Sequence, residues 1–149
     1  MLIACSVPVE RPILTEFFAA SRLRDRTRLQ QLATVIFEPT SQGIVSTFEI
    51  IGVSTERRTP LARWPGLEPE AGGAASPTPL SAIELSLADP RAPLDHGPYD
   101  GELVTKDVTI TAPVRLGGGQ VEKTLIITME RASLREPKRI GRWVITEVR

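Results

Sequence analysis

The sequence has few of the residues that build metal and catalytic sites, with one Cys, one His and no Asn among 149 residues. A single Cys excludes a disulfide framework, and one Cys with one His excludes a Cys-rich or His-rich zinc site. The 18 basic side chains balance 18 acidic ones, so net charge gives no reason to expect nucleic-acid binding. We therefore expect no metal, no cofactor and no nucleic-acid partner.

Long hydrophobic runs are also absent, because no stretch approaches the roughly 20 apolar residues of a membrane-spanning helix. The most specific motif comes at the start, where Leu2-Ile3-Ala4-Cys5 contains the single Cys. Two prolines follow within Ser6 to Pro12, which is typical of a short irregular tether. We interpret residues 1–11 as a tether or signal-peptide remnant and residues 12–149 as one domain.

Leu2 to Cys5 resembles the end of a bacterial lipoprotein signal peptide, in which aliphatic and small residues precede an invariant Cys. The resemblance implies lipid attachment at Cys5 and a place in the cell envelope, on the periplasmic or outer-surface side. Only four residues precede Cys5, fewer than such a peptide needs, so this hypothesis moves the true start upstream. Alternatively, Cys5 is a small apolar residue in the frayed N-terminus of a cytoplasmic protein.

Residues 12–36 are predicted to form two short helices. Pro12 suits a first helical turn, Asp25 or Thr27 can cap the second helix, and Pro39 closes it. The positions at helical spacing are Leu14, Phe17, Phe18 and Ser21, then Leu29, Leu32, Ala33 and Ile36.

Arginines gather where these two helices meet, and residues 11–35 hold five basic against two acidic groups. A solvated helix end explains such a cluster. The alternative is a surface for an anionic partner, with Arg22 and Arg26 as candidate contacts.

The remaining periodicity indicates antiparallel strands. Residues 44–54 are predicted to form a strand buried on parts of both faces, and Val104–Leu116 and Val121–Arg131 alternate as the arms of a hairpin. The inward set on these arms is Val108, Ile110, Ala112, Val114, Leu116, Val121, Leu125, Ile127 and Met129. Gly117 to Gly119 supply the turn between the arms. Pro113 marks an edge or a bulge, and Arg142–Val148 is predicted as the last strand.

Residues 56–101 carry eight of the thirteen prolines and are predicted to be a long Pro-rich insertion. Alternation over residues 81–88 predicts a short edge strand inside it. Trp64 is either a hydrophobic docking point for a partner or a side chain that folds back on the domain.

Candidate chemistry is sparse. Gly117 to Gly119 lack the following Lys and Ser or Thr of a phosphate-binding loop. Asp95, His96 and Tyr99 place an acid–base set within five residues, but Gly97-Pro98 between them favours a turn.

The order of elements resembles the nuclear-transport-factor-2-like and cystatin-like families. The resemblance rests on Phe17-Phe18 in the first helix, on Arg24-Asp25-Arg26 at the helix break and on Trp143 at the final strand, and it covers residues 13–37 and 141–148. It implies an α+β fold in which an N-terminal helix pair packs on a curved antiparallel sheet. This chain departs from the pattern in having no evident third helix, with the Pro-rich segment in its place.

Proteins of that fold include ketosteroid-isomerase-like enzymes, small-ligand binders and interaction modules, so the resemblance leaves two hypotheses. The first is a non-enzymatic, lipid-anchored protein-interaction module or accessory subunit of a membrane complex. The alternative is a small-ligand-binding or isomerase-like pocket protein, with Asp95, His96 and Tyr99 facing a cavity of at least about 300 Å³.

Overall fold

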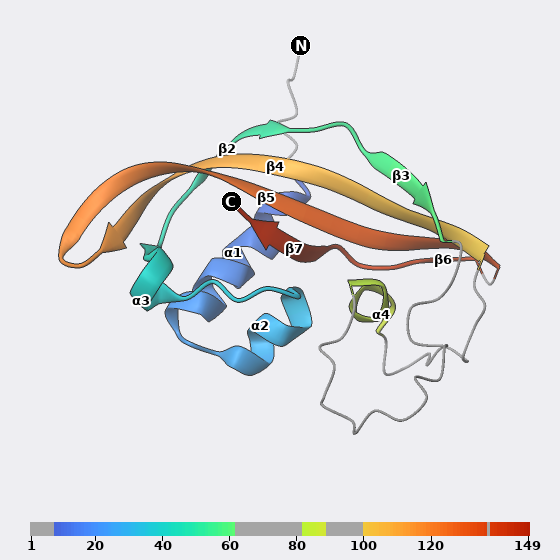
Figure 1. Cartoon of the computed structure of the whole chain (residues 1–149), viewed down its shortest axis with the longest axis horizontal. Helices are drawn as coiled ribbons and strands as arrows, with labels where there is room; N and C mark the ends of the chain where they lie inside the picture. The colour runs from blue at the N-terminus through green and yellow to red at the C-terminus, as the bar shows by residue number, and fades with distance from the viewer. Residues whose placement is uncertain (1–7, 62–81, 89–99, 137) are drawn as a thin grey trace, which may run out of the picture.

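The computed structural model describes residues 8–61, 82–88, 100–136 and 138–149. Its elements are α1 (Glu10–Arg22), α2 (Arg26–Leu32), α3 (Pro39–Gln42), β1 (Ile44–Val45), β2 (Glu49–Val53), β3 (Arg57–Pro60), α4 (Ala82–Leu87), β4 (Asp100–Leu116), β5 (Gly119–Glu136), β6 (Arg139–Ile140) and β7 (Val144–Val148). Figure 1 shows an α+β fold, with the N-terminal helices beneath a curled antiparallel sheet, as the sequence predicts.

The hairpin of β4 and β5 forms the two central strands of the sheet (Figure 1). The short strands β1, β2 and β3 pair with β4, and β6 and β7 pair with β5. The predicted hairpin turn is confirmed, because Leu116 pairs with Gly119 across Gly117 and Gly118, whose φ angles are 60° and 83°. Only glycine adopts two such angles in succession at little cost.

The main core lies between α1, α2 and the inner face of the sheet. Phe17 of α1 is fully buried, as are Val108, Ile110 and Ile127 on the central strands. The predicted helix pair is confirmed, and the Asp25 carboxylate caps α2 by accepting a hydrogen bond from Arg28 N at 3.0 Å. Helix, cap and strand patterns therefore agree in burying one apolar layer.

The edge strand predicted within residues 81–88 is wrong, because residues 82–87 form α4. Ile83 and Leu87 are spaced i, i+4, so one turn of helix buries both side chains against Ala132 and Leu134. Neighbouring residues of a strand point to opposite faces, and Ala132 alternates with the residues that face α1. Helix α4 thus packs on the alternate set of β5 side chains and forms a second apolar cluster, separate from the main core.

The second helix is shorter than predicted. It ends at Leu32, after which Ala33 is extended and bridges Ile145 in parallel, with Thr34 N donating to Ile145 O at 2.9 Å. Ile36, expected on its buried face, is 52% exposed. Pro39 does not close this helix but begins α3. A bond to the last strand replaces the next helical turn, which local spacing could not predict.

The strand predictions need further corrections at the edges. Residues 44–54 form two strands, and Ile51 and Val53 are exposed because no described element covers the outer face of β2. Leu116 and Val121 are also exposed, at the end of the hairpin. Strand bounds differ as well: β4 begins at Asp100, β5 runs from Gly119 to Glu136, and the last strand begins at Val144. Strand β3 lies inside the predicted insertion. Most of the insertion lies outside the described residues.

Candidate functional site

A groove lies between α1 and the connection from β1 to β2. Its volume is about 230 Å³, below the roughly 300 to 1,000 Å³ of pockets for drug-sized ligands. Its lining residues are Arg11, Thr15, Phe18, Ala19, Arg22, Val45, Ser46, Thr47 and Phe48. The groove therefore suits a few side chains or a short stretch of peptide.

One wall of the groove is a stripe along α1. Arg11, Thr15, Phe18 and Arg22 recur at intervals of three to four residues, so they share one side of the helix. Eleven residues at 1.5 Å per residue separate the two arginines by about 16 Å along the helix axis. Two cationic residues thus line the groove about three helical turns apart.

The opposite wall is a break in the ladder beside β4. Val45 pairs with Val114 and Glu49 pairs with Thr111, so three residues, 46–48, lie opposite two. One of those two is Pro113, which has no N–H to donate. In the described part of the chain, Ser46 and Thr47 make no backbone hydrogen bond to another residue. The predicted edge or bulge at Pro113 is confirmed, and it frees backbone groups along the groove.

Aromatic rings form the floor. The Phe18 and Phe48 ring centroids are 5.7 Å apart, and the Arg11 guanidinium carbon lies 5.4 Å from the centroid of Phe48. Phe48 is half-buried, whereas Phe18 is 3% exposed. Because Phe18 also contacts Phe37 in the core, the floor is firmly supported.

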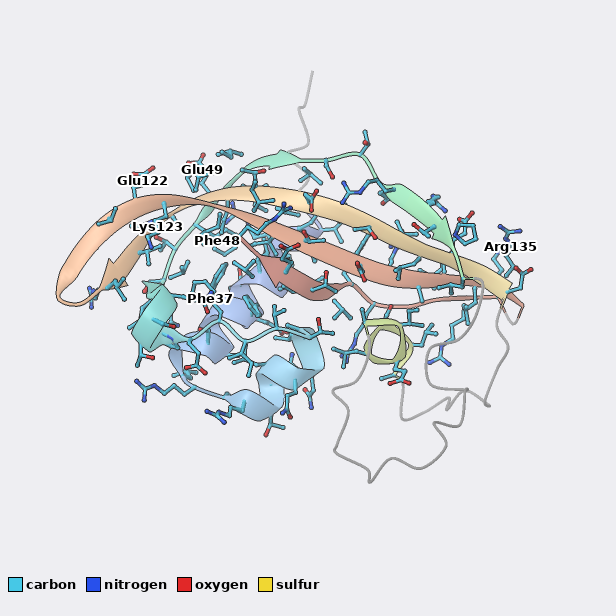
Figure 2. The ribbon with its side chains drawn as sticks, viewed as in Figure 1. Phe37, Phe48, Glu49, Glu122, Lys123 and Arg135 are labelled. Atoms are coloured by element: carbon cyan, nitrogen blue, oxygen red, sulfur yellow. The ribbon has the colours of Figure 1, made fainter. Side chains whose placement is uncertain are left out.

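The groove carries positive charge only. Its lining holds two arginines and no carboxylate. In the described part of the chain, the ion pairs of α1 are Glu16 with Arg28 and Glu10 with Lys106, and neither includes Arg11 or Arg22. Figure 2 shows Glu49 on the outer side of the sheet and Phe48 on the helix side. The two arginines are therefore available to an anionic ligand.

A second polar cluster lies in the interior, where Lys106 pairs with Glu10 at the start of α1. The Lys106 ammonium lies 4.0 Å from the Trp143 ring centroid, and the Arg131 guanidinium carbon lies 4.5 Å from it. Burial raises the pKa of the Glu10 carboxyl, but the hydrogen bond from Lys106, a backbone hydrogen bond and the charge of Lys106 together outweigh burial and lower that pKa overall. This cluster secures α1 to the sheet.

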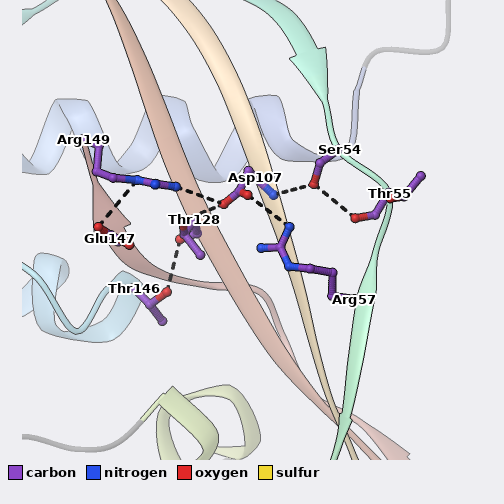
Figure 3. A network of polar contacts seen from close by, with 8 residues as sticks. All are labelled: Ser54, Thr55, Arg57, Asp107, Thr128, Thr146, Glu147 and Arg149. Carbon is purple, nitrogen blue, oxygen red and sulfur yellow. Dashed lines mark hydrogen bonds and ion pairs between the residues drawn. The ribbon is translucent and has the colours of Figure 1, made fainter.

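A third cluster spans the outer face (Figure 3). Asp107 accepts from the Thr128 hydroxyl at 2.7 Å and from Arg57 Nη1 at 3.1 Å, and Arg149 lies 3.7 Å away. The Thr128 hydroxyl lowers the pKa of Asp107, burial opposes that effect, and Arg57 and Arg149 lower the pKa further. With both carboxylate oxygens occupied by groups of the chain itself, this cluster ties β4 to its neighbours.

The predicted site residues have different outcomes. Arg22 lines the groove, whereas Arg26 is the first residue of α2, is exposed and does not line the groove. Cys5, Trp64, Asp95, His96 and Tyr99 lie outside the described residues. The roles predicted for those five residues therefore stay predictions.

Sequence reasoning missed Arg11, Thr15 and Phe48. The two α1 residues could have been found, because Arg11 and Thr15 lie i, i+4 on the same stripe as Arg22. Phe48 could not, since its position depends on a bulge that only the pairing with β4 reveals.

The groove is equipped for binding. Guanidinium groups recognise carboxylates in a two-point geometry, and the hydroxyls of Ser46, Thr47 and Thr15 add donors and acceptors. Thr15 donates its hydroxyl hydrogen to Arg11 O at 2.8 Å, and no acid–base side-chain pair lines this groove.

Two further results concern the described ranges alone. They contain no group of three or more His, Cys, Asp or Glu side chains placed to hold a metal ion. Within them, no helix is both long and apolar enough to cross a lipid bilayer.

The chain matches no protein-family model, no curated protein and no solved structure.

Proposed function

We propose that this protein is a non-enzymatic, lipid-anchored module of the cell envelope that binds another protein, as an accessory subunit of a membrane-associated complex. The observation that carries the proposal is the groove lined by Arg11 and Arg22, a binding surface with two cationic residues about three helical turns apart and no acid–base pair in its lining. The lipoprotein-like motif Leu2 to Cys5 supports the anchor.

The short tether supports a partner at the membrane. Five residues from Cys5 to Glu10 span at most about 18 Å when fully extended. An acyl group on Cys5 would thus hold the start of α1, and with it Arg11, close to the bilayer.

We assign the domain to the nuclear-transport-factor-2-like or cystatin-like group. The helix pair, the antiparallel meander after it and the buried Trp143 before β7 support this assignment.

The test is the intact mass of the protein purified from its own host, with its distribution between membrane and soluble fractions. We expect a chain that begins at Cys5, carries acyl groups and sediments with membranes. Cys5→Ser should release the protein, whereas Ser6→Ala should not. An unmodified Cys5 in the soluble fraction would contradict the anchor. Solubilised membranes that return only the monomer would contradict the accessory-subunit role.

A further inference from the structure

We infer that the groove takes an extended acidic peptide of a partner protein, with one carboxylate on Arg11, one on Arg22 and an apolar side chain between them over Phe18 and Phe48. This inference rests on the proposed protein-binding function and adds the chemistry of the partner. It is carried by charge, by spacing and by free backbone groups.

The lining of the groove is positively charged, because it holds two arginines and no acidic residue. Neither arginine forms an ion pair with another described residue, so a carboxylate ligand displaces no partner of theirs. Arg11 is also steadied by its contact with Phe48, which reduces the entropy lost on binding.

The spacing of Arg11 and Arg22 favours a peptide over a single small anion. The arginines are about 16 Å apart along α1. An extended chain rises about 3.4 Å per residue, so side chains four residues apart lie about 14 Å from one another. Residues i, i+2 and i+4 of a strand also share one face. The matching pattern is acidic, any, apolar, any, acidic.

The bulge opposite Pro113 leaves main-chain groups available to a bound peptide. Ser46 and Thr47 are exposed and make no backbone hydrogen bond to another described residue. A peptide laid along this wall can exchange main-chain hydrogen bonds with them, as a strand added to a sheet edge does. A free anion can accept hydrogen bonds from their N–H groups but has no donor for their carbonyls, so only a peptide uses both.

The experiment uses the purified chain at 150 mM salt and a fluorescent peptide with the core Asp-Thr-Leu-Thr-Asp. A scrambled peptide of the same composition places the two Asp on opposite faces, and a third peptide carries Lys for Asp. The test variant is Arg11→Gln with Arg22→Gln. Its matched control, Arg24→Gln with Arg26→Gln, loses the same charge from residues outside the groove lining.

We expect the Asp peptide to bind, the other two peptides to bind at least tenfold more weakly, and the test variant to lose at least tenfold in affinity. The control variant should bind within about twofold of the original. Amide NMR signals of Ser46 and Thr47 should shift on binding.

Four results would overturn the inference: no binding by the Asp peptide, equal binding by the scrambled peptide, equal loss in both double variants, or no change at Ser46 and Thr47. Inorganic phosphate or anionic vesicles that compete as well as the peptide would also overturn it. The peptide assay needs neither the acyl group nor the native partner. If the Asp peptide did not bind but solubilised membranes still returned a partner protein, this inference alone would be refuted. If the protein proved to have no lipid anchor, its affinity for the peptide would be unchanged.

Discussion

The ammonium group of Lys106 lies 4.0 Å from the centroid of the Trp143 ring and pairs with the carboxylate of Glu10. Both charged side chains are buried, at 7% and 10% exposure. Isolated charges are costly in such a place, so each partner depends on the other. The pair joins the start of α1 to the central strand β4, beside the groove.

Glu10→Gln should therefore destabilise the fold by about 2 to 4 kcal/mol, because Lys106 keeps a buried charge without its counter-ion. Lys106→Met should be similarly costly, since it leaves Glu10 unpaired. The double variant should be more stable than the sum of the two changes predicts. Urea unfolding of all four proteins measures this coupling, and additive effects would show that the pair is not coupled.

Asp107 should make the fold sensitive to acid. Its pKa in the folded chain is lowered from 3.8, first by the Thr128 hydroxyl and then, against burial, by Arg57 and Arg149. A lowered folded pKa stabilises the protein above the unfolded pKa, and this stabilisation is lost as pH falls through the folded value.

Asp107→Asn should cost about 1 kcal/mol or less at pH 7, because the carboxylate is partly exposed, and its cost should vanish well below pH 3.8. Unfolding experiments at several pH values test this. The exposed Asp100 provides the control, since Asp100→Asn removes the same charge from the surface of the same strand. A cost that persisted unchanged in acid would mean that the Asp107 charge is not its source.

Arg24 should be replaceable with a gain in stability. Its φ of 55° is left-handed, and it ends α1 with two bonds, Arg24 N to Ser21 O and Asp25 N to Ala20 O. Glycine adopts this angle without the steric penalty, although it loses more entropy on folding. We expect Arg24→Gly to raise stability by about 0.5 to 1 kcal/mol. Arg26→Gly, within α2, should lower it, and thermal unfolding will separate the two.

Ser86 should control the attachment of α4. Its hydroxyl donates to Arg142 O at 2.7 Å and accepts from Ala132 N at 3.0 Å, so Ser86→Ala leaves two backbone groups without partners. We expect a loss of about 2 to 4 kcal/mol in local stability. Gly141→Ala should act on the same contact, because an added Cβ would lie 2.2 Å from the Ser86 hydroxyl.

Hydrogen exchange of α4 amides measures that loss directly. Both changes should speed exchange in residues 82–87 while leaving α1 protected, because the two helices pack in separate apolar clusters. Thr15→Ala, on the exposed side of α1, serves as a control. Unchanged exchange in α4 would refute the role of Ser86.

Elements whose signals are local can be predicted from the amino-acid sequence alone. The Asp25 cap, the apolar spacing of the two N-terminal helices and the glycines after Leu116 each act within a few residues. The alternation of β4 and β5 likewise predicts their buried face, because a strand's side-chain period is two. Arg22 could be proposed as a contact residue for the same reason, because it lies on a helix whose side-chain period is known.

The remaining features depend on residues far apart in the chain, so they follow only from the folded structure. Residues 82–87 form a helix because two of its apolar side chains, Ile83 and Leu87, pack together on Ala132 and Leu134 of β5. Lys106 occupies a core position because Glu10, 96 residues away in the sequence, pairs with it. The groove exists because the ladder beside Pro113 opens next to α1, bringing Phe48 to Arg11. No local pattern specifies such meetings, since their energy appears only when the two segments touch.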